Sequence, residues 1–206
     1  MKKRQYEMRA RGEAKAATRE AVLNAAIETF LAERSFSVTL GPVAERAGVT
    51  VKTILRHFGS REALIEAAWS RAFRDAVAER SALPGDRDAS RTALIAHYER
   101  RGPMVLVVLA EEDEDPRARH MCDAGRVAHR AWVEEVFGAS LPAEREDRCR
   151  LIDVLVVATD VYAWKLLRLD RGLSAGEVHD RMLLLTESIL AAATGVPQCA
   201  TEGRAP

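Results

Sequence analysis

Hydroxyl, basic and small apolar side chains recur at helical spacing in two adjacent runs, V-T-L-G-P-V-A-E-R-A-G-V and T-V-K-T-I-L-R-H-F. A lysine such as Lys52 can donate hydrogen bonds to the acceptor atoms of guanine, and the aliphatic Val51 can contact the methyl group of thymine. Threonine hydroxyls and imidazole rings can hold phosphate groups without reading base sequence. We therefore predict that the residues that contact a nucleic acid are Thr39, Thr50, Val51, Lys52, Thr53, Arg56 and His57.

The two runs predict two short helices, over residues 40–47 and 51–58, joined by a tight turn. Thr39 and Thr50 stand directly before these helices, where a hydroxyl can accept hydrogen bonds from unpaired N–H groups. Gly48 allows the backbone conformation that the turn requires. This order of elements is typical of a helix-turn-helix, whose second helix enters the major groove of DNA.

Helical periodicity continues through nearly all of the 206 residues, and no run alternates with the period of two that a strand would show. A hydrophobic fraction of 48% is sufficient for a core. We expect an all-α fold, with an N-terminal three-helix helix-turn-helix domain followed by a C-terminal helical domain, to which the resemblance described below assigns ligand binding and dimerisation. The other expected helices cover residues 18–34, 61–81, 89–101, 103–112, 116–138, 143–171 and 174–194.

The clearest break in the pattern is the turn-forming segment Leu83-Pro84-Gly85-Asp86. We expect residues 1–60 to hold a basic arm, over about the first 15 residues, and the DNA-binding domain. Residues 61–196 are expected to form the second helical domain, and residues 197–206 a tail without fixed structure.

Charge is distributed unevenly along the chain, although the formal net charge is zero. Residues 1–62 hold 12 Lys or Arg against 7 Asp or Glu, a net charge of +5, and the remainder carries −5. A basic N-terminal segment on an acidic body suits a protein that binds nucleic acid and has a separate partner domain. The basic residues expected to add a salt-sensitive contribution to DNA affinity are Lys2, Lys3, Arg4, Arg9, Arg11 and Lys15.

Several other classes of protein are disfavoured. Three cysteines without C-x-x-C spacing argue against a disulfide framework, and no apolar run approaches the ~20 residues that span a membrane. The start of the chain lacks the apolar core of a signal peptide, so we expect a cytoplasmic protein. No phosphate loop or nucleophile elbow occurs, so we do not expect an enzyme. The spacing of His120, Cys122 and His129 does not match that of zinc ligands, so no metal or cofactor is expected.

From Thr18 to Phe73 the sequence resembles the TetR family of bacterial transcriptional regulators. The matching segments are T-R-E-A-V-L-N-A-A-I-E-T-F, T-L-G-P-V-A-E-R-A-G-V-T-V-K-T-I-L-R-H-F and G-S-R-E-A-L. The resemblance implies a repressor that binds a pseudopalindromic double-stranded DNA operator as a homodimer and is released by a small-molecule effector.

Within the helix-turn-helix, two residues depart from the pattern of the family. Leu55 replaces a Tyr that commonly meets a backbone phosphate, and Gly41 replaces a residue that is frequently polar or basic. Ile54 and Phe58 lie four residues apart and are expected to face the core. We therefore expect a weaker DNA affinity, or a register held more by the arm and the first helix.

The remaining helices must supply the dimer contact and the effector site. The segment from Leu151 to Leu169 is apolar nearly all round, so one face can meet the core and another a second subunit. We expect a homodimer through helices 143–171 and 174–194, and a hydrophobic or aromatic effector bound between bundle helices. The candidate ligand-binding residues, for each of which plain core packing is the alternative, are Tyr98, Met104, Cys122, His129, Trp132 and Tyr162.

Two other functions stay open at the level of sequence. In the first, the regulator senses oxidation through Cys122 or Cys149, which would require an accessible thiol of low pKa. In the second, the helix-turn-helix is vestigial and the chain is a helical protein-interaction module.

Overall fold

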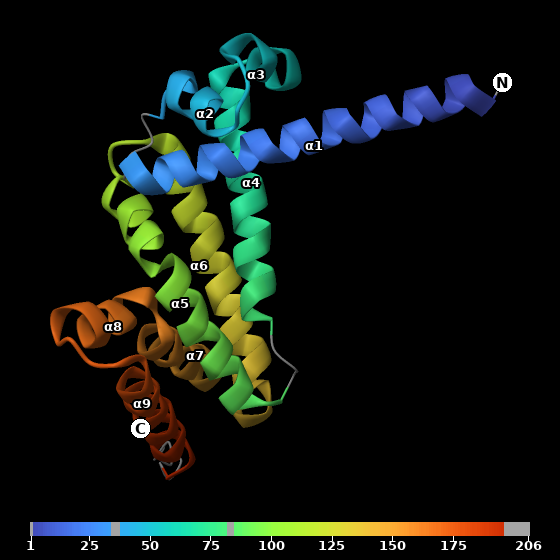
Figure 1. Ribbon diagram of the computed structural model, residues 1–206. Helices are drawn as coiled ribbons and strands as arrows, with labels where there is room; N and C mark the ends of the chain where they lie inside the picture. Colours follow the sequence, from blue (N-terminus) through green and yellow to red (C-terminus); the bar gives the residue numbers. More distant parts are fainter. Residues whose placement is uncertain (1, 34–37, 82–84, 196–206) are drawn as a thin grey trace, which may run out of the picture. The chain divides into compact units, whose positions relative to one another are not determined.

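The computed structural model describes residues 2–33, 38–81 and 85–195, and within these ranges all regular structure is helical (Figure 1). The main α-helices are α1 (Lys2–Glu33), α2 (Leu40–Arg46), α3 (Val51–Phe58), α4 (Arg61–Arg80), α5 (Arg87–Ala110), α6 (Pro116–Phe137), α7 (Arg145–Thr159), α8 (Val161–Lys165) and α9 (Ala175–Gly195). A 3-10 turn η1 (Gly138–Ser140) follows α6, and a π-helical turn η2 (Leu166–Asp170) follows α8. The all-α fold predicted from the sequence is confirmed. The expected tail over residues 197–206 lies outside the described residues.

The chain divides into two compact units. Unit 1 comprises residues Met1–Glu79 and Val107–Arg119, and unit 2 comprises Arg80–Leu106 and His120–Pro206. By packing, α4 as far as Glu79 therefore groups with α1, α2 and α3, whereas the sequence placed a boundary at residue 60. A functional division at residue 60 stays a prediction.

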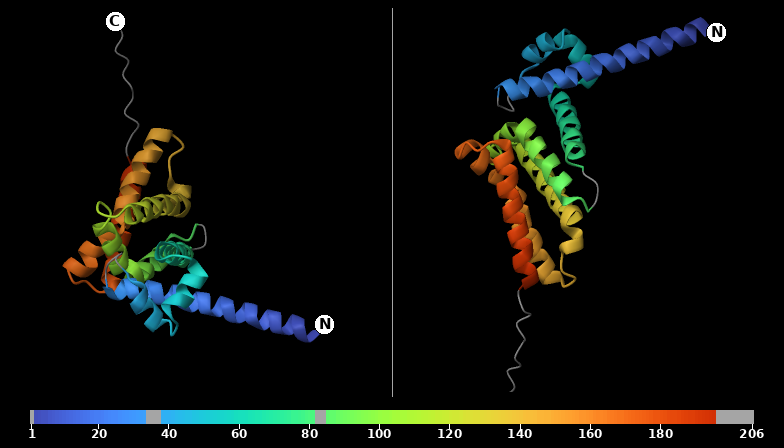
Figure 2. Two further views of the ribbon diagram at one scale, coloured as in Figure 1. Left: turned by 90° about the horizontal axis from the view of Figure 1, so that it is seen from above. Right: turned by 60° about the horizontal axis from the view of Figure 1, so that its bottom comes forward.

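In unit 1, α1 begins at Lys2, so the backbone over the expected mobile arm is helical (Figures 1 and 2). The N-terminal part of α1 projects beyond α2, α3 and α4 in these views. Farther along, Phe30 packs edge-on against Trp69 of α4, with ring centroids 4.5 Å apart. Arg71 of α4 forms ion pairs with Glu20 of α1 and with Asp75. These contacts fix α1 across α4 and support the helix-turn-helix.

In unit 2, α5 runs without a break through Gly102 and Pro103, so the two helices predicted over 89–101 and 103–112 are wrong. Proline in a helix removes one hydrogen bond but does not always end the helix. Glycine at position 102 allows the Trp164 ring to pack against α5, because a Cβ atom there would lie 2.5 Å from that ring. Trp164 also donates to Glu99 on α5, with Nε1 2.8 Å from Oε1.

The single helix predicted over residues 143–171 is interrupted in the structure at Asp160. There the backbone is extended, with φ −71° and ψ 157°, and the carboxylate accepts from the Tyr162 N–H at 2.9 Å. Aspartate favours this N-cap position because it satisfies a donor that the new helix leaves unpaired. Because the residues on both sides of Asp160 are apolar at helical spacing, the sequence pattern did not reveal the break between α7 and α8.

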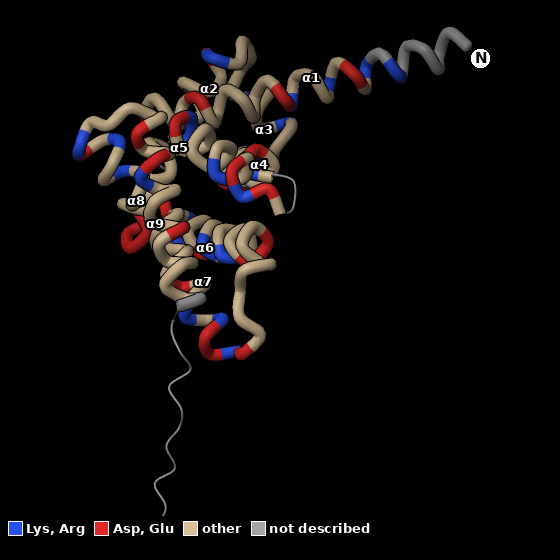
Figure 3. The backbone as a smooth tube through the Cα atoms, turned by 90° about the horizontal axis from the view of Figure 1, so that it is seen from below, with Lys and Arg blue, Asp and Glu red and all other residues tan. Residues whose placement is uncertain are grey.

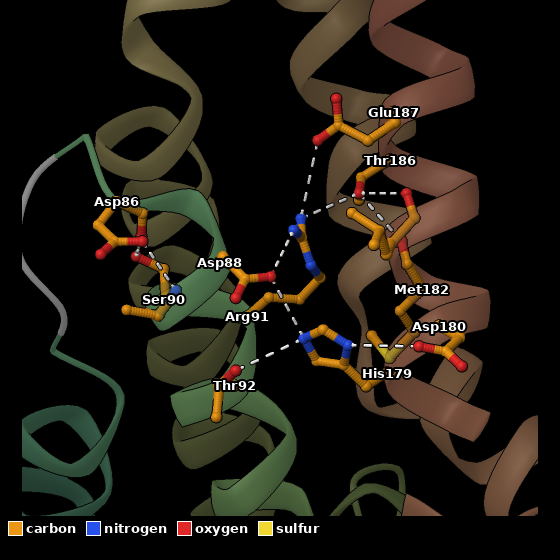
Figure 4. Close-up of polar contacts among 12 residues, drawn as sticks. Asp86, Asp88, Ser90, Arg91, Thr92, His179, Asp180, Met182, Thr186 and Glu187 are labelled. Carbon is orange, nitrogen blue, oxygen red and sulfur yellow. Dashed lines mark hydrogen bonds and ion pairs between the residues drawn. The ribbon is translucent and has the colours of Figure 1, made fainter. Parts of the chain in front are cut away.

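A polar contact ties the start of α5 to α9 in the interior of unit 2 (Figure 4). The Arg91 side chain is buried, and its guanidinium lies 3.3 Å from Thr186 Oγ1 and 3.4 Å from Asp88 Oδ1. A carboxylate oxygen of Glu187 lies 4.0 Å away. The charge of Arg91 is therefore balanced by two carboxylates.

Candidate nucleic-acid interface

The helix α3 starts with a complete N-cap. Thr50 has an extended backbone, and its Oγ1 accepts a hydrogen bond from the Thr53 N–H at 3.1 Å. The hydroxyls of Thr50 and Thr53 also lie 3.0 Å apart, so both face the same end of the helix. The predicted cap is confirmed, and the two hydroxyls form one exposed polar corner.

The N-cap residue of α2, Thr39, differs from that of α3. It occupies the N-cap position of α2 with extended backbone, but its side chain makes no cap hydrogen bond. The predicted hydroxyl cap at Thr39 is therefore wrong, although the residue is exposed. Its hydroxyl is not committed to a cap bond within the helix.

The turn between α2 and α3 depends on Gly48, whose φ of 64° lies in the left-handed region. Around it, Ala47 N donates to Val43 O at 2.9 Å, and Val49 N donates to Ala44 O at 3.0 Å. These bonds satisfy carbonyls at the end of α2 and fix the direction in which α3 leaves.

The core side of this motif is anchored on α1. Arg46 Nη1 donates to Thr29 Oγ1 at 2.6 Å, and the same hydroxyl donates to Ala25 O at 2.7 Å. On the other side, Arg61 Nε donates to Val38 O at 2.6 Å. The motif is therefore held at its start and its end by hydrogen bonds that do not involve α3.

The outer face of α3 carries the side chains expected to read DNA. Ile54 is fully buried, while Lys52 and Arg56 are exposed and Val51 is 38% exposed. Leu55 is also exposed, at 41%, so an aliphatic side chain occupies the position where the resemblance led us to expect a phosphate-binding Tyr. The helix therefore presents two cations flanked by apolar surface.

His57 and Phe58 lie at the boundary between this face and the core. Phe58 is only half-buried, and the Arg19 guanidinium lies 5.1 Å above its ring. Phe58, which was expected to face the core, thus lies at its edge and makes a cation–π contact with α1. Nδ1 of His57 is buried without a hydrogen-bond partner in the described structure, so the phosphate contact of His57, which stays a prediction, would have to use Nε2.

Basic residues recur in the first half of α1, with acidic residues among and after them (Figure 3). Arg11, Lys15 and Arg19 are exposed, whereas Arg9 is partly neutralised by Glu13 at 2.9 Å. The side chains of the predicted arm residues Lys2, Lys3 and Arg4 lie outside the described residues. Spaced cations on a protruding helix can contribute a salt-sensitive affinity for phosphates.

The cavity described in unit 1 is too small to hold an effector. This cavity measures about 20 Å³ and lies among apolar side chains that include Phe30, Leu64 and Trp69. Such a volume holds a single water at most.

The predicted ligand-binding residues separate into two groups in unit 2. Five are buried: Tyr98, Met104, Cys122, His129 and Trp132. Tyr162 is 51% exposed on α8 and does not join them.

Three of these buried residues share one polar cluster. The Tyr98 hydroxyl donates to Thr159 O at 2.9 Å, and Thr159 Oγ1 lies 3.1 Å from His129 Nε2. The rings of His129 and Trp132 are stacked, and Trp132 Nε1 donates to Arg80 O at 3.2 Å.

Sequence reasoning did not single out Arg80. It is the last residue of α4, where a basic side chain is ordinary because it complements the helix dipole. In the structure it is buried, at 8% exposure. No local pattern distinguishes a buried arginine at a helix end from a solvated one, so only the packing of unit 2 could identify it.

The structure also bears on the thiol, metal and membrane features considered from the sequence. Of the two cysteines considered for redox sensing, Cys122 is buried and Cys149 is exposed. Among the described residues no group of His, Cys, Asp or Glu is arranged to hold a metal ion. No helix in the described part of the chain is long and apolar enough to cross a membrane.

Comparison with known proteins agrees with this geometry. Residues 22–68 match the profile of the bacterial regulatory proteins of the tetR family. No curated protein sequence matches the chain significantly.

Solved structures share the fold at low sequence identity. A transcriptional regulator from Rhodococcus sp. Rha1 has a TM-score of 0.64 and 16% identity, over 87% of this chain and 99% of that one. A putative TetR-family transcriptional regulator from Rhodococcus sp. has a TM-score of 0.58 and 18% identity, over 84% and 98%. A TetR transcription regulator from Haloarcula marismortui ATCC 43049 has a TM-score of 0.55 and 12% identity, over 86% and 98%.

At these identities the solved structures establish the fold alone, while the sequence profile covers α2, α3, the end of α1 and the start of α4. The profile match assigns residues 22–68, which contain the helix-turn-helix, to the tetR family of bacterial regulatory proteins, and the solved structures show that most of the chain shares their fold.

Proposed function

We propose that the protein is a transcriptional repressor that binds a pseudopalindromic DNA operator through α3. The observation that carries this proposal is the division of α3 into two faces. Ile54 is fully buried, whereas Lys52 and Arg56 point to solvent from a helix that begins with exposed hydroxyls. In a helix-turn-helix the exposed start of the second helix contacts base edges, and hydroxyls beside it contact phosphates.

We further propose that the protein acts as a homodimer, because one short helix reads too few bases to select a site. The support lies in unit 2, where α7 and α9 pack on each other and expose large aliphatic side chains. On α7, Val154 is 47% and Val157 70% exposed; on α9, Leu184 is 63% and Leu185 44% exposed. Apolar surface of this kind marks a protein interface, and a two-fold axis would pair the same two helices of each subunit.

Release from DNA is proposed to follow the binding of a small effector in unit 2. An effector shifts the DNA affinity only if it binds more tightly to the conformation in which the recognition helices are badly spaced. Support comes from the course of α4, which begins beside the helix-turn-helix at Arg61 and ends at Arg80, the first residue of unit 2. A ligand that contacts Arg80 would therefore act on the end of a helix that belongs to the DNA-binding unit.

The direct test is selection from a pool of random double-stranded oligonucleotides with the full-length protein. We expect enrichment of a pseudopalindrome whose half-sites are about one helical turn apart. Failure to enrich any sequence at low salt would reject DNA recognition and favour the protein-interaction module.

A further inference from the structure

Unit 2 contains two buried arginines, Arg91 and Arg80, which differ in whether a carboxylate balances the charge. Arg91 is 3% exposed and is balanced by Asp88 and Glu187 (Figure 4). Arg80 is 8% exposed, yet no carboxylate in the described structure forms an ion pair with it; its Nε, like that of Arg91, is buried without a hydrogen bond. A buried guanidinium without a counter-charge is costly, because desolvation is not repaid by an ion pair.

A second unsatisfied atom lies in the same cluster, on His129. Thr159 has one hydroxyl hydrogen, which it donates to Leu155 O at 2.7 Å. With that hydrogen committed to Leu155, we assign the Nε2–H tautomer to His129, in which Nε2 donates to Thr159 Oγ1, 3.1 Å away. In the neutral ring this leaves Nδ1 as a bare acceptor, and Nδ1 is buried with no partner in the described structure.

The environment keeps that ring neutral. Burial lowers the pKa of His129, and the nearby positive charge of Arg80 lowers it further. Burial also lowers the pKa of Arg80 itself. The carboxylate of Asp160 acts in the opposite direction and raises the pKa of His129, but it forms no ion pair with Arg80 in the described structure. The cluster therefore holds a cation without a paired carboxylate and an acceptor that lacks a donor.

The two unsatisfied groups belong to one arrangement. Trp132 stacks on His129 with ring centroids 5.7 Å apart, and its Nε1 donates to the Arg80 carbonyl at 3.2 Å. Tyr98 closes the other side through its bond to the Thr159 carbonyl at 2.9 Å. Two aromatic rings thus stand beside the unpaired groups.

We infer that unit 2 binds an aromatic hydroxy acid, whose carboxylate pairs with the Arg80 guanidinium and whose hydroxyl donates to His129 Nδ1. This inference rests on the proposed effector response and specifies the chemical class of the effector. A carboxylate matches the planar fork of a guanidinium and can accept two parallel hydrogen bonds from it. The aromatic side chains of Trp132 and Tyr98 beside the unpaired groups favour an aromatic ring in the ligand.

The inference is tested by nuclear magnetic resonance on the full chain with ¹⁵N-labelled arginine. The Arg80 Nε–Hε signal is assigned by its loss in Arg80→Lys. The probes are 2-, 3- and 4-hydroxybenzoate, with benzoate lacking the donor and 4-hydroxybenzamide lacking the charge. We expect at least one hydroxybenzoate to shift the Arg80 signal saturably, benzoate to bind about 3- to 10-fold more weakly, and the amide not to shift it.

Two variants separate a binding role from a structural one. Arg80→Gln should weaken hydroxybenzoate binding by about 10- to 100-fold, measured through quenching of tryptophan fluorescence. The matched control Arg171→Gln removes an exposed arginine of unit 2 and should leave binding unchanged. Unfolding curves of both variants establish that they fold.

Three results would overturn the inference: no hydroxybenzoate shifts the Arg80 signal, the neutral amide binds as well as the acids, or Arg80→Gln binds them normally. Because these titrations contain no DNA, they are independent of the operator selection. A protein that selects an operator but ignores the acids loses only this inference, and one that binds the acids but no DNA loses the proposed function.

Discussion

The ring of His129 lies nearly parallel to that of Trp132, with the ring planes 10° apart and the centroids separated by 5.7 Å. This stack holds the His129 ring beside Thr159, whose hydroxyl fixes the proton on Nε2. The neutral imidazole of His129 therefore lies buried near the positive charge of Arg80. Stability and ligand response in unit 2 both depend on this arrangement.

Replacement of Arg80 by Met should stabilise the protein in the absence of ligand. The variant removes a buried charge that no carboxylate balances, and the gain in the free energy of unfolding should be about 1–2 kcal/mol. Urea unfolding followed by circular dichroism measures it. Arg91→Met is the control and should lower stability instead, because Arg91 has partners to lose. Equal losses in both variants would mean that Arg80 is compensated in the folded state.

His129 should make stability fall in mild acid. Its pKa in the folded protein is lowered from 6.5, so the unfolded chain binds a proton first as the pH drops. The stabilising contribution is complete above about pH 6.5 and is lost as the pH falls toward the lowered folded-state pKa. Urea unfolding at pH 7.5 and pH 5.5 should show this loss in the wild type and a smaller one in His129→Gln. The exposed His120 of the same helix provides the control, His120→Gln, which should keep the wild-type loss.

The two N-cap threonines should differ in their effect on stability. Thr50→Ala removes the hydroxyl that accepts from Thr53 N and should cost about 1 kcal/mol. Thr39→Ala removes a hydroxyl that makes no cap bond and should cost less than half of that. Thermal unfolding of the two variants compares them directly, and equal losses would contradict the assigned caps.

A charge on the exposed apolar face of α7 and α9 should separate the subunits. Val157 is 70% exposed on α7, and Val157→Glu would bury an unpaired carboxylate in the proposed dimer. Sedimentation equilibrium should show a dimer for the wild type and a monomer for this variant. Val127 is as exposed, at 72%, but lies on α6, so Val127→Glu should remain dimeric. A dimeric Val157→Glu would place the interface elsewhere.

Sequence reasoning predicted the helix-turn-helix well because its determinants are local. Gly48 must adopt a positive φ, Thr50 must cap a helix, and Ile54 must face inward, and each requirement is visible in the residue type. These local signals predicted the ends of α2 and α3 to within one residue of where they lie in the structure.

The errors arose where distant packing outweighs a local signal. Gly102 and Pro103 have the composition of a turn, yet Gly102 admits the Trp164 ring and α5 continues through both residues. Asp160 ends α7 inside an apolar stretch, because it caps α8. Arg80 is buried in a cluster in which its carbonyl accepts from Trp132, 52 residues away along the chain, so no short window of sequence reveals its burial.

The claim that α3 reads DNA is tested most directly by a fluorescence anisotropy titration of the selected oligonucleotide with wild type and Lys52→Ala. Loss of a base-contacting lysine should weaken specific binding by about 1–3 kcal/mol, roughly 5- to 150-fold, and relax the preference at one position of each half-site. Arg150→Ala, which removes an exposed arginine of α7, should bind like the wild type. If Lys52→Ala keeps both the affinity and the base preference of the wild type, α3 does not read the operator in the way that the structure indicates.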